Sequence, residues 1–384
     1  MNRVSTMQAE SRKPFPCPIF TDGIKISLHS GGVSVAATGV DLKNSLCMTG
    51  EGLAEVSGIT GDINDPATYE KVSETLHQVS AVDAVACDLH PDLHSTRLAF
   101  QLSERLDVPL IRVQHHHAHI ATVMAEHGMN GPAVGLAMDG YGYGTDGSAW
   151  GGECLYIDGG ECSREGYLKP VAMPGGDAAS RQPWRMAVAW LNGNDSLARL
   201  FDGLPVATIR RLCESENTPL TSSAGRLFDA ASAIVLGSRD VAFEGEAAVA
   251  LEKAAMGVTE IHPLSYNLEQ SSGVLQLDCT EAMNQLMEAV LNNESKPELA
   301  AGFHRMLAAG MAEMATRVAT LRGVKNIVLA GGCFLNALLK EQVTAHLEDA
   351  GLRVFCSQKL PYGDGAIALG QAWVAVQKLK AGDV

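Results

Sequence analysis

The residues whose types and spacing point most clearly to chemistry are four histidines within five positions, in the segment VQHHHAHIATVMAEHGM at residues 113–129. This segment is expected to form a helix, on which His115 and His119 face the same side and can reach one ion with both imidazoles. His116 lies about 100° around such a helix from His115, and His117 lies nearly opposite. The glutamate of the H-E-x-x-H zinc-protease motif is missing, which argues against that class. The alternative interpretation is a helix that is merely rich in histidine.

Two aspartates are placed where they could complete a metal site. Asp139 is expected to end the strand VGLAMD and enter the turn GYGYG, and Asp364 lies in PYGDG, at the mouth of the last helix. Carboxylates at such positions point into a cleft. A site of two imidazoles and two carboxylates suits iron, zinc or manganese rather than calcium or a soft thiolate metal. The alternative interpretation is that both aspartates cap a turn or a helix.

Four glycine-rich or polar turns are candidate anion sites. They are DGYGYGTDG at 139–147, MPGGDAAS at 173–180, AGGCFLN at 330–336 and DLKNS at 41–45. In AGGCFLN a strand, a double glycine and a helix start follow one another, which directs free N–H groups at a ligand. None of the four matches the P-loop or the dinucleotide-binding fingerprint, so both of these modes of cofactor binding are excluded.

The order of strands and helices indicates an α/β fold. Apolar strands at 81–91 and 109–114 alternate with helices, and the end of the chain runs strand, helix, strand, helix from 326 to 380. Residues 182–256 are expected to be mostly helical, and another long helix covers about 298–321. Alternation of this kind predicts sheets covered by helices, with ligands at the carboxyl ends of strands. The two halves each begin with a strand and a glycine turn, which suggests an internal duplication.

Composition restricts the function classes. The chain has 384 residues, of which 46% are hydrophobic, and its formal net charge of −15 disfavours a nucleic-acid partner. Nine scattered cysteines without a C-x-x-C pair argue against a zinc ribbon and a disulfide framework. The absence of a signal peptide and of a membrane-spanning run predicts a cytoplasmic protein without a membrane partner. Residues 1–18 are expected to be a loose tail.

Several segments occur in an order that resembles a known family. They are VQHHHAHI, DGYGYGTDGSAWGGE, MPGGDAASRQPWR, SSAGRLFDAASA, FEGEAA, AGGCFLN and LPYGDGAIALGQ. Together they resemble the carboxy-terminal carbamoyltransferase domain of the HypF family, which acts in the maturation of nickel–iron hydrogenases. GVDLKNSLCM and DLHPDLHST resemble the amino-terminal part of that domain, so the resemblance covers nearly the whole chain from about Phe20. The domain is similar to tRNA threonylcarbamoyl transferases and to antibiotic O-carbamoyltransferases.

The resemblance implies a fold of the actin-like, sugar-kinase-like ATPase type. Two RNase H-like lobes would enclose a nucleotide and metal cleft, with a mostly helical insertion at about 182–256. The first lobe would span 19–130, with the C-terminal helix at 364–380 packing back on it. The second lobe would span 131–363.

The resemblance also implies the site residues. One divalent metal, iron or zinc, would be bound by His115, His119, Asp139 and Asp364. An adenine nucleotide would be lined by Lys43, Asn44, Gly140, Gly142, Gly175, Gly176, Asp177, Gly225, Asp229, Gly331, Gly332 and Asn336. Glu244 and Glu246 are expected nearby.

The implied reaction moves the carbamoyl group of carbamoyl-adenylate to the C-terminal cysteine of the partner HypE. Family members usually carry an acylphosphatase domain, zinc fingers and an adenylate-forming domain as well, and the sequence contains none of them. A separate protein or domain would then supply carbamoyl-adenylate, whether the chain is an excised domain or a natural short form. Three alternatives stay open: a carbamoyltransferase acting on a small-molecule hydroxyl, a tRNA modifier, which the charge disfavours, and a non-catalytic nucleotide-binding scaffold of hydrogenase assembly.

Overall fold

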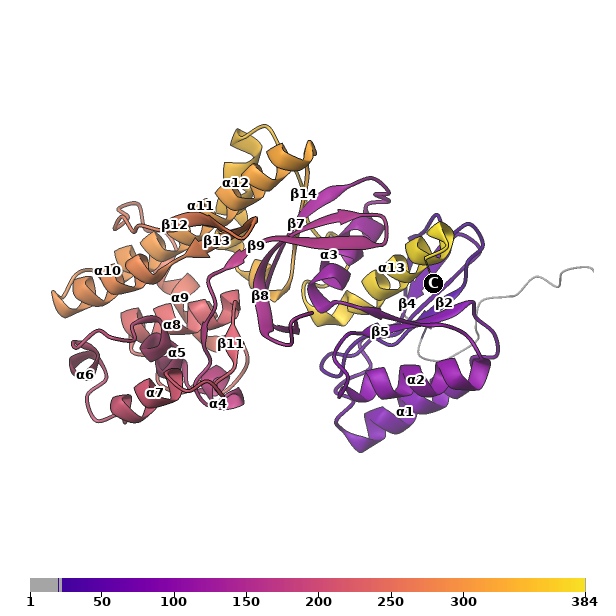
Figure 1. Cartoon of the computed structure of the whole chain (residues 1–384), viewed down its shortest axis with the longest axis horizontal. Coiled ribbons are helices and arrows are strands. Elements are labelled where there is room, and N and C mark those ends of the chain that lie inside the picture. Colours follow the sequence, from indigo (N-terminus) through magenta and orange to yellow (C-terminus); the bar gives the residue numbers. More distant parts are fainter. Residues whose placement is uncertain (1–19, 21–22, 384) are drawn as a thin grey trace, which may run out of the picture.

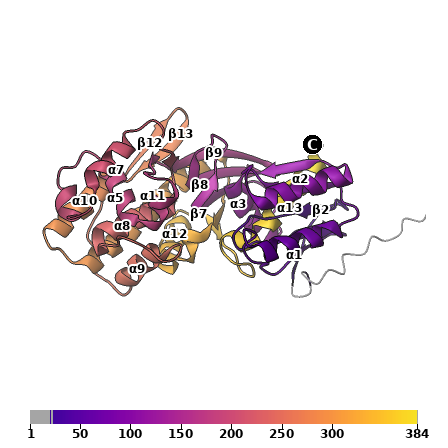
Figure 2. The ribbon, with the colours of Figure 1, turned by 90° about the horizontal axis from the view of Figure 1, so that it is seen from below.

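Two lobes, each with its own β-sheet, make up the computed structural model of the chain (Figure 1; Figure 2). The structure describes residue 20 and residues 23–383, so the tail predicted at 1–18 lies outside the described residues. Each sheet is covered by helices, as the alternating pattern of the sequence predicts.

The first lobe is built on a six-stranded sheet in the order β1-β4-β3-β2-β5-β6. Strands β2, β3 and β4 are antiparallel neighbours, and β5 and β6 then continue parallel to β2. Helices α1 and α2 pack on each other, and α2 packs on β5 and β6. The bounds are β1 Ile24–Ser27, β2 Val35–Ala37, β3 Cys47–Gly50, β4 Leu53–Val56, α1 Pro66–His77, β5 Ala84–Asp88, α2 His94–Leu106 and β6 Leu110–Val113.

The second sheet repeats this order. Strands β9, β8 and β7 are antiparallel neighbours, and β14 and β15 continue parallel to β7. The β12–β13 hairpin extends the other edge, and β10 and β11 pair beside β8. The predicted fold class of two RNase H-like lobes is therefore confirmed by the strand order. The bounds are β7 Ala133–Tyr143, β8 Ala149–Asp158, β9 Glu161–Leu168, β10 Val171–Ala172, β11 Leu220–Thr221, β12 Asn267–Ser271, β13 Val274–Asp278, β14 Asn326–Ala330 and β15 Arg353–Phe355.

A group of helices forms the far end of the second lobe. Its core is lined by fully buried aromatic side chains such as Phe228 and Phe303, whose rings meet edge to face 5.1 Å apart. None of the helices in the described part of the chain is both long and apolar enough to cross a membrane. The bounds are α4 Asp177–Arg181, α5 Pro183–Trp190, α6 Leu197–Leu200, α7 Val206–Cys213, α8 Ala224–Leu236, α9 Glu246–Ala255, α10 Thr280–Leu291, α11 Lys296–Arg322 and α12 Ala337–Asp349.

The last helix of each lobe covers the sheet of the other lobe. Helix α3 (His115–Glu126), which follows β6 of the first sheet, packs on β7 and β14 of the second. Helix α13 (Ile367–Ala381), which follows β15 of the second sheet, packs on β2 and β5 of the first. The two helices also contact each other extensively between the lobes (Figure 1). This exchange joins the lobes through their hydrophobic cores.

The helices α3 and α13 approach most closely at Gly370. A Cβ atom added at this glycine would lie 1.8 Å from the carbonyl oxygen of Ala118 and 2.7 Å from Oγ1 of Thr122. Backbone oxygen atoms cannot move aside as a flexible side chain can. Any side chain at position 370 must therefore push the two helices apart.

We predict that Gly370→Ala lowers the free energy of unfolding by about 3 kcal/mol, because the added methyl group overpacks the helix crossing. Denaturant unfolding followed by circular dichroism measures this. The control is Gly131→Ala, where an added Cβ meets no atom within 4 Å. Equal stability of the two variants would contradict the prediction.

Candidate metal centre between the lobes

The four predicted ligands come from three separate parts of the chain. Helix α3 begins at His115 because the side chain of Gln114 accepts a hydrogen bond from the N–H of His117, which caps the helix. His119 follows one turn later. Asp364 begins the short 3₁₀ helix η3 (Asp364–Ala366), directly ahead of α13.

The sequence predicted Asp139 at the end of a strand, but in the structure Asp139 lies within β7. The strand continues to Tyr143, but its pairing with β14 stops at Ala137. Its pairing with β8 is irregular between Met138 and Gly142. At the position where the sequence predicted a strand end, the hydrogen-bond ladder of β7 is interrupted. A β-bulge of this kind changes the direction of a side chain, here that of Asp139.

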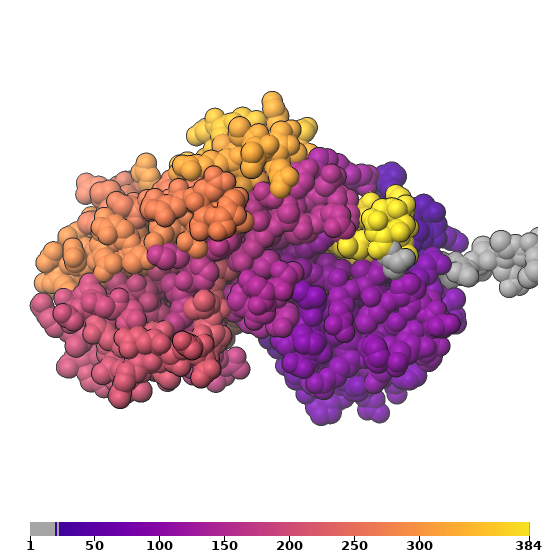
Figure 3. All heavy atoms as spheres, in the orientation of Figure 1, coloured from indigo at the N-terminus to yellow at the C-terminus, as the bar shows by residue number. Residues whose placement is uncertain are grey.

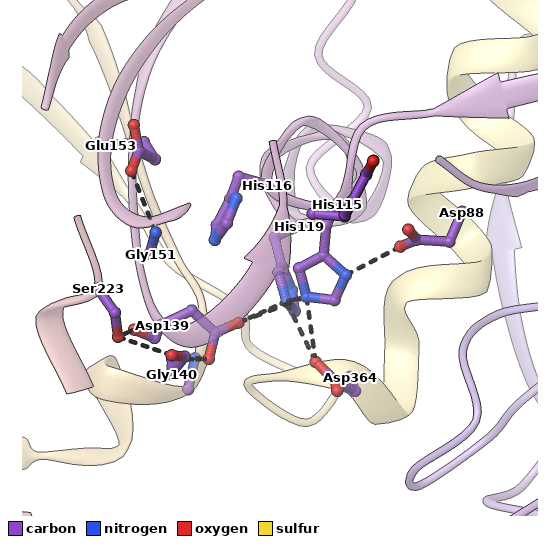
Figure 4. Close-up of polar contacts among 12 residues, drawn as sticks. Asp88, His115, His116, His119, Asp139, Gly140, Gly151, Glu153, Ser223 and Asp364 are labelled. Carbon is purple, nitrogen blue, oxygen red and sulfur yellow. Dashed lines mark hydrogen bonds and ion pairs between the residues drawn. The ribbon is translucent and has the colours of Figure 1, made fainter. Parts of the chain in front are cut away.

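The structure brings His115, His119, Asp139 and Asp364 together (Figure 4). Nε2 of His119 is 2.9 Å from Oδ2 of Asp139 and 3.3 Å from Oδ1 of Asp364. The Nε2 atoms of the two histidines are 3.1 Å apart. All four ligand atoms lie within 4.8 Å of one another, and all but Asp364 belong to buried residues.

Asp88, at the end of β5, orients His115. Its Oδ2 lies 2.9 Å from Nδ1 of His115, and the residue is 1% exposed. The Nδ1–H of His115 therefore donates to this carboxylate, which leaves the lone pair of Nε2 directed at the cluster. Sequence reasoning missed Asp88, although it is a carboxylate that ends an apolar strand, just as Asp139 was expected to be.

The chemistry of the cluster fits a bound cation. Oδ2 of Asp139 is buried and has no hydrogen-bond donor in the described structure. This oxygen faces the Nε2 atoms of His115 and His119. In neutral His115 the proton is on Nδ1, which donates to Asp88, so Nε2 carries none. Buried acceptors that converge in this way are costly without a shared cation. Two nitrogen and two oxygen ligands at such spacing can hold iron, zinc or a similar divalent ion.

Without an ion, the same four groups share protons. Burial lowers the pKa of His115 and His119, but their close contacts with the acceptor carboxylates of Asp139 and Asp364 raise it more, so the net pKa lies above 6.5 for both. Burial raises the pKa of the two aspartates, and the two histidines lower it to below 3.8. The ion-free cluster therefore binds protons where a metal would bind.

His116 and His117 are not members of the cluster, and both are neutral. Burial lowers the pKa of His116 well below 6.5, and it lowers the pKa of His117 to about 3. The His116 ring stacks on the Trp150 ring. Arg164 also lies over the Trp150 ring, with its guanidinium carbon 3.8 Å from the centroid of that ring. Arg164 also pairs with the fully buried Glu153 at 2.6 Å. This network supports the β7–β8 hairpin behind the ligands.

Glycines bring two other backbone segments close to Asp139. A Cβ added at Gly225 would lie 2.9 Å from Cα of Gly140, and one at Gly331 would lie 2.4 Å from the carbonyl oxygen of Met138. The N–H of Gly332 donates to Oδ1 of Asp139 at 3.3 Å. These glycines, predicted to line a nucleotide, are thus placed around the candidate metal centre.

Other predicted residues lie at the two sides of the site. Nζ of Lys43 in the first lobe is 3.8 Å from Oε2 of Glu244 in the second lobe. Asp229 is paired with Arg226 at 2.6 Å inside α8, where both are buried. Glu246 caps its own turn, since its carboxylate accepts from the N–H of Ala242.

Gly142 lies near the end of β7, and Gly175, Gly176 and Asp177 lie where the chain enters α4. A Cβ added at Gly142 would lie 2.7 Å from Cδ2 of His115, so this glycine makes room for the ligand ring. Gly175 and Gly176 have φ angles of +92° and +56° and form the turn that leads into α4. Burial raises the pKa of Tyr141, two residues beyond Asp139, and the charges of Tyr143, Asp88 and, to a smaller extent, Asp177 at the start of α4 add to this shift.

The side chains of Asn44 and Asn336, both predicted to line a nucleotide, make hydrogen bonds within the protein. Nδ2 of Asn44 donates to the carbonyls of Thr38 and Val40, and the residue is fully buried. Oδ1 of Asn336 caps α12, and its Nδ2 donates to Nε2 of His304 at 2.9 Å. Both amides stabilise their own lobe.

Fold and site together define a two-lobed α/β protein of the actin-like, sugar-kinase-like class with a candidate metal centre at the lobe junction. The space-filling view shows the surface hollowed between the α1–α2 side of the first lobe and the helical part of the second (Figure 3). A family model described as "Carbamoyltransferase, Kae1-like Domain, second subdomain" matches residues 135–371, and one described as "HypF Kae1-like domain" matches residues 31–126. The chain belongs to the HypF carbamoyltransferase family.

Similar proteins support this assignment. The carbamoyltransferase HypF2 of Cupriavidus necator is 40% identical over 385 residues, which cover 92% of this chain and 48% of HypF2. A HypF homolog of the same organism is 39% identical and is covered over 92% of its length. The crystal structure of full-length HypF in a phosphate- and nucleotide-bound form matches with a TM-score of 0.84 and 31% identity, over 92% of this chain and 47% of that one. The chain thus spans about half the length of HypF2 and of that structure.

We predict that the ion-free protein loses stability as the pH rises above 6.5. The raised pKa of His115 and His119 means that their protonation stabilises the folded state below that pH, and this contribution disappears as the pH rises through the raised values. Thermal melts of chelator-treated protein across a pH series measure the effect. Added zinc should remove the alkaline loss, and identical pH profiles with and without zinc would contradict the prediction.

We predict that Asp88→Asn weakens metal binding about tenfold, because outer carboxylates that orient a ligand histidine typically contribute this much. Asp88 accepts from both His115 Nδ1 and the N–H of His90, and one amide oxygen cannot replace both carboxylate oxygens. Metal titration measures the affinity. Asp158→Asn, at the exposed end of β8, is the control and should bind like the unaltered chain.

Proposed function

We propose that the chain transfers a carbamoyl group from carbamoyl-adenylate to the C-terminal cysteine thiolate of HypE, during assembly of the cyanide ligands of nickel–iron hydrogenase. Membership of the HypF carbamoyltransferase family supports the reaction class. A related full-length HypF has been crystallised in a phosphate- and nucleotide-bound form, which supports an adenine nucleotide as ligand. A separate protein or domain would supply the adenylate.

The observation that carries this proposal is the convergence of His115, His119, Asp139 and Asp364 at the lobe junction. The fold brings the four groups together, and one of them, Asp139, has an oxygen without a hydrogen-bond donor. Asp139 is also the residue that the glycine turns surround. A metal and a nucleotide phosphate could therefore meet at this carboxylate.

A bound iron or zinc ion would supply Lewis acidity to the phosphate and the carbamoyl oxygen. The four ligands would hold it, and Asp88 would keep Nε2 of His115 free to coordinate. In the reaction the thiolate sulfur bonds to the carbamoyl carbon, and the bond from that carbon to the phosphate oxygen breaks. AMP leaves with the electron pair, and the acceptor has given up its proton before attack.

The walls of the site would bind the nucleotide. The backbone at Gly140, Gly225, Gly331 and Gly332 carries no side chains, so phosphate oxygens could approach it closely. The N–H groups of Gly140 and Gly332 already donate to Asp139, so a phosphate bound here would lie beside that carboxylate. Lys43 and Glu244 meet from opposite lobes and would be the first side chains that a nucleotide meets at the mouth of the site. Closure of the lobes over the ligand would exclude water from the labile carbamoyl-adenylate.

We predict that His119→Ala abolishes both metal binding and carbamoyl transfer while leaving the fold intact. His119 contributes the shortest ligand contact, 2.9 Å to Asp139, and three ligands with a gap bind an ion much less tightly. Metal analysis of the purified variant gives the stoichiometry. A transfer assay with supplied carbamoyl-adenylate and HypE gives the activity.

The matched control is His346→Ala, which removes an exposed histidine from α12. It should retain one ion per chain and full transfer. Full metal occupancy in His119→Ala would contradict the ligand assignment. Normal metal binding without transfer to HypE in the unaltered chain would retain the metal site but reject HypE as the acceptor.

A further inference from the structure

Asp364 differs from the other three ligands in how it is held. Its side chain is 28% exposed, whereas those of His115, His119 and Asp139 are 7%, 3% and 11% exposed. It follows an irregular segment, 356–363, that connects β15 to the 3₁₀ helix. A ligand at the end of such a segment needs other contacts to fix its position.

Glu126, the last residue of α3, holds this segment. Its Oε2 accepts hydrogen bonds from Oγ of Ser357 and from the N–H of Gln358, both at 3.0 Å. Its Oε1 accepts from the N–H of Lys359. Three donors of one turn are thus bound by a single carboxylate, and hydrogen bonds to a charged acceptor are stronger than neutral ones.

Two further contacts connect α3 to the same stretch of chain. Oγ1 of Thr122 donates to the carbonyl of Ala366 at 3.2 Å, and Gly370 lies against the carbonyl of Ala118. Positions 118, 122 and 126 are spaced by four and lie on one side of α3. That side of the helix therefore receives the chain from Ser357 to Gly370, with Asp364 in the middle.

We propose that Glu126 is a positioning residue for the metal centre, an inference that rests on the proposed function of the four-ligand cluster. Helix α3 carries His115 and His119 in its first two turns and Glu126 at its last residue, about 17 Å from His115 at the α-helical rise per residue. One rigid helix thereby supplies two ligands and sets the distance to the loop that supplies a third. Glu126 acts through Asp364 and touches no reacting atom.

A purely stabilising role of Glu126 predicts a different effect of its loss on metal coordination. If Glu126 only stabilised the segment, its loss would lower the free energy of unfolding but leave the ligands around the ion unchanged. If it positions Asp364, its loss must change the coordination itself. Cobalt(II), which accepts the same nitrogen and oxygen ligands, reports coordination through its visible absorption.

The experiment titrates cobalt(II) alone into the chelator-treated full chain and into Glu126→Ala, Glu126→Gln and Glu104→Ala. We expect about tenfold weaker binding and an altered visible band for Glu126→Ala. Glu126→Gln, which keeps one acceptor oxygen for the turn, should lie between this variant and the unaltered chain. Glu104→Ala removes an exposed glutamate near the end of α2 and should change neither quantity.

The outcomes separate this inference from the function on which it rests. An unaltered affinity and band in Glu126→Ala, with cobalt bound by the unaltered chain, would overturn the positioning role alone. Failure of the unaltered chain to bind cobalt would overturn the metal assignment and the positioning role together. If Glu126→Ala does not fold, Glu126→Gln decides: a spectrum identical to that of the unaltered chain overturns the role, and a shifted one supports it.

Discussion

The contact between α3 and α13 is the constraint on which the site depends. Because each lobe sends its last helix to cover the sheet of the other, the first turn of α3 and the 3₁₀ turn ahead of α13 are brought to the same place. The absence of a side chain at Gly370 allows the helices to touch through their backbones. The ligands from residues far apart in sequence can meet only because this crossing sets their separation.

The second requirement is the balance of charge in a buried place. Two carboxylates and two imidazoles lie within a few ångströms, in a chain whose net charge is −15. Desolvation alone would drive each group to its neutral form, and the opposite shifts in pKa show that mutual attraction outweighs it. A divalent ion satisfies the same attraction while it leaves the imidazoles neutral, so the cluster is suited to exchange protons for a metal.

The sequence predicted the fold class, which the structure confirms, and it singled out the four residues that the structure brings together, because both leave local signals. Helical spacing places His115 and His119 together, and turn residues around Asp139 and Asp364 indicate a cleft. Supporting groups could not be found in this way: Asp88 and Glu126 act on partners that are 27 and about 230 residues away. Asparagine serves turns and caps as readily as ligands, and only the contacts show that the amides of Asn44 and Asn336 make hydrogen bonds within their own lobes.

The repeated strand order explains how both lobes support one site. Strands β5 and β14 occupy the same position in their sheets, each parallel to the first strand of the antiparallel trio. At the end of β5, Asp88 accepts from His115; just beyond β14, the N–H of Gly332 donates to Asp139. The two equivalent strand ends thus hold one residue of the cluster each. The end of β5 supplies an acceptor for the imidazole of His115, and the chain just beyond β14 supplies a donor for the carboxylate of Asp139. A duplicated fold can build an asymmetric centre in this way, because the two copies need to share only their geometry and not their residues.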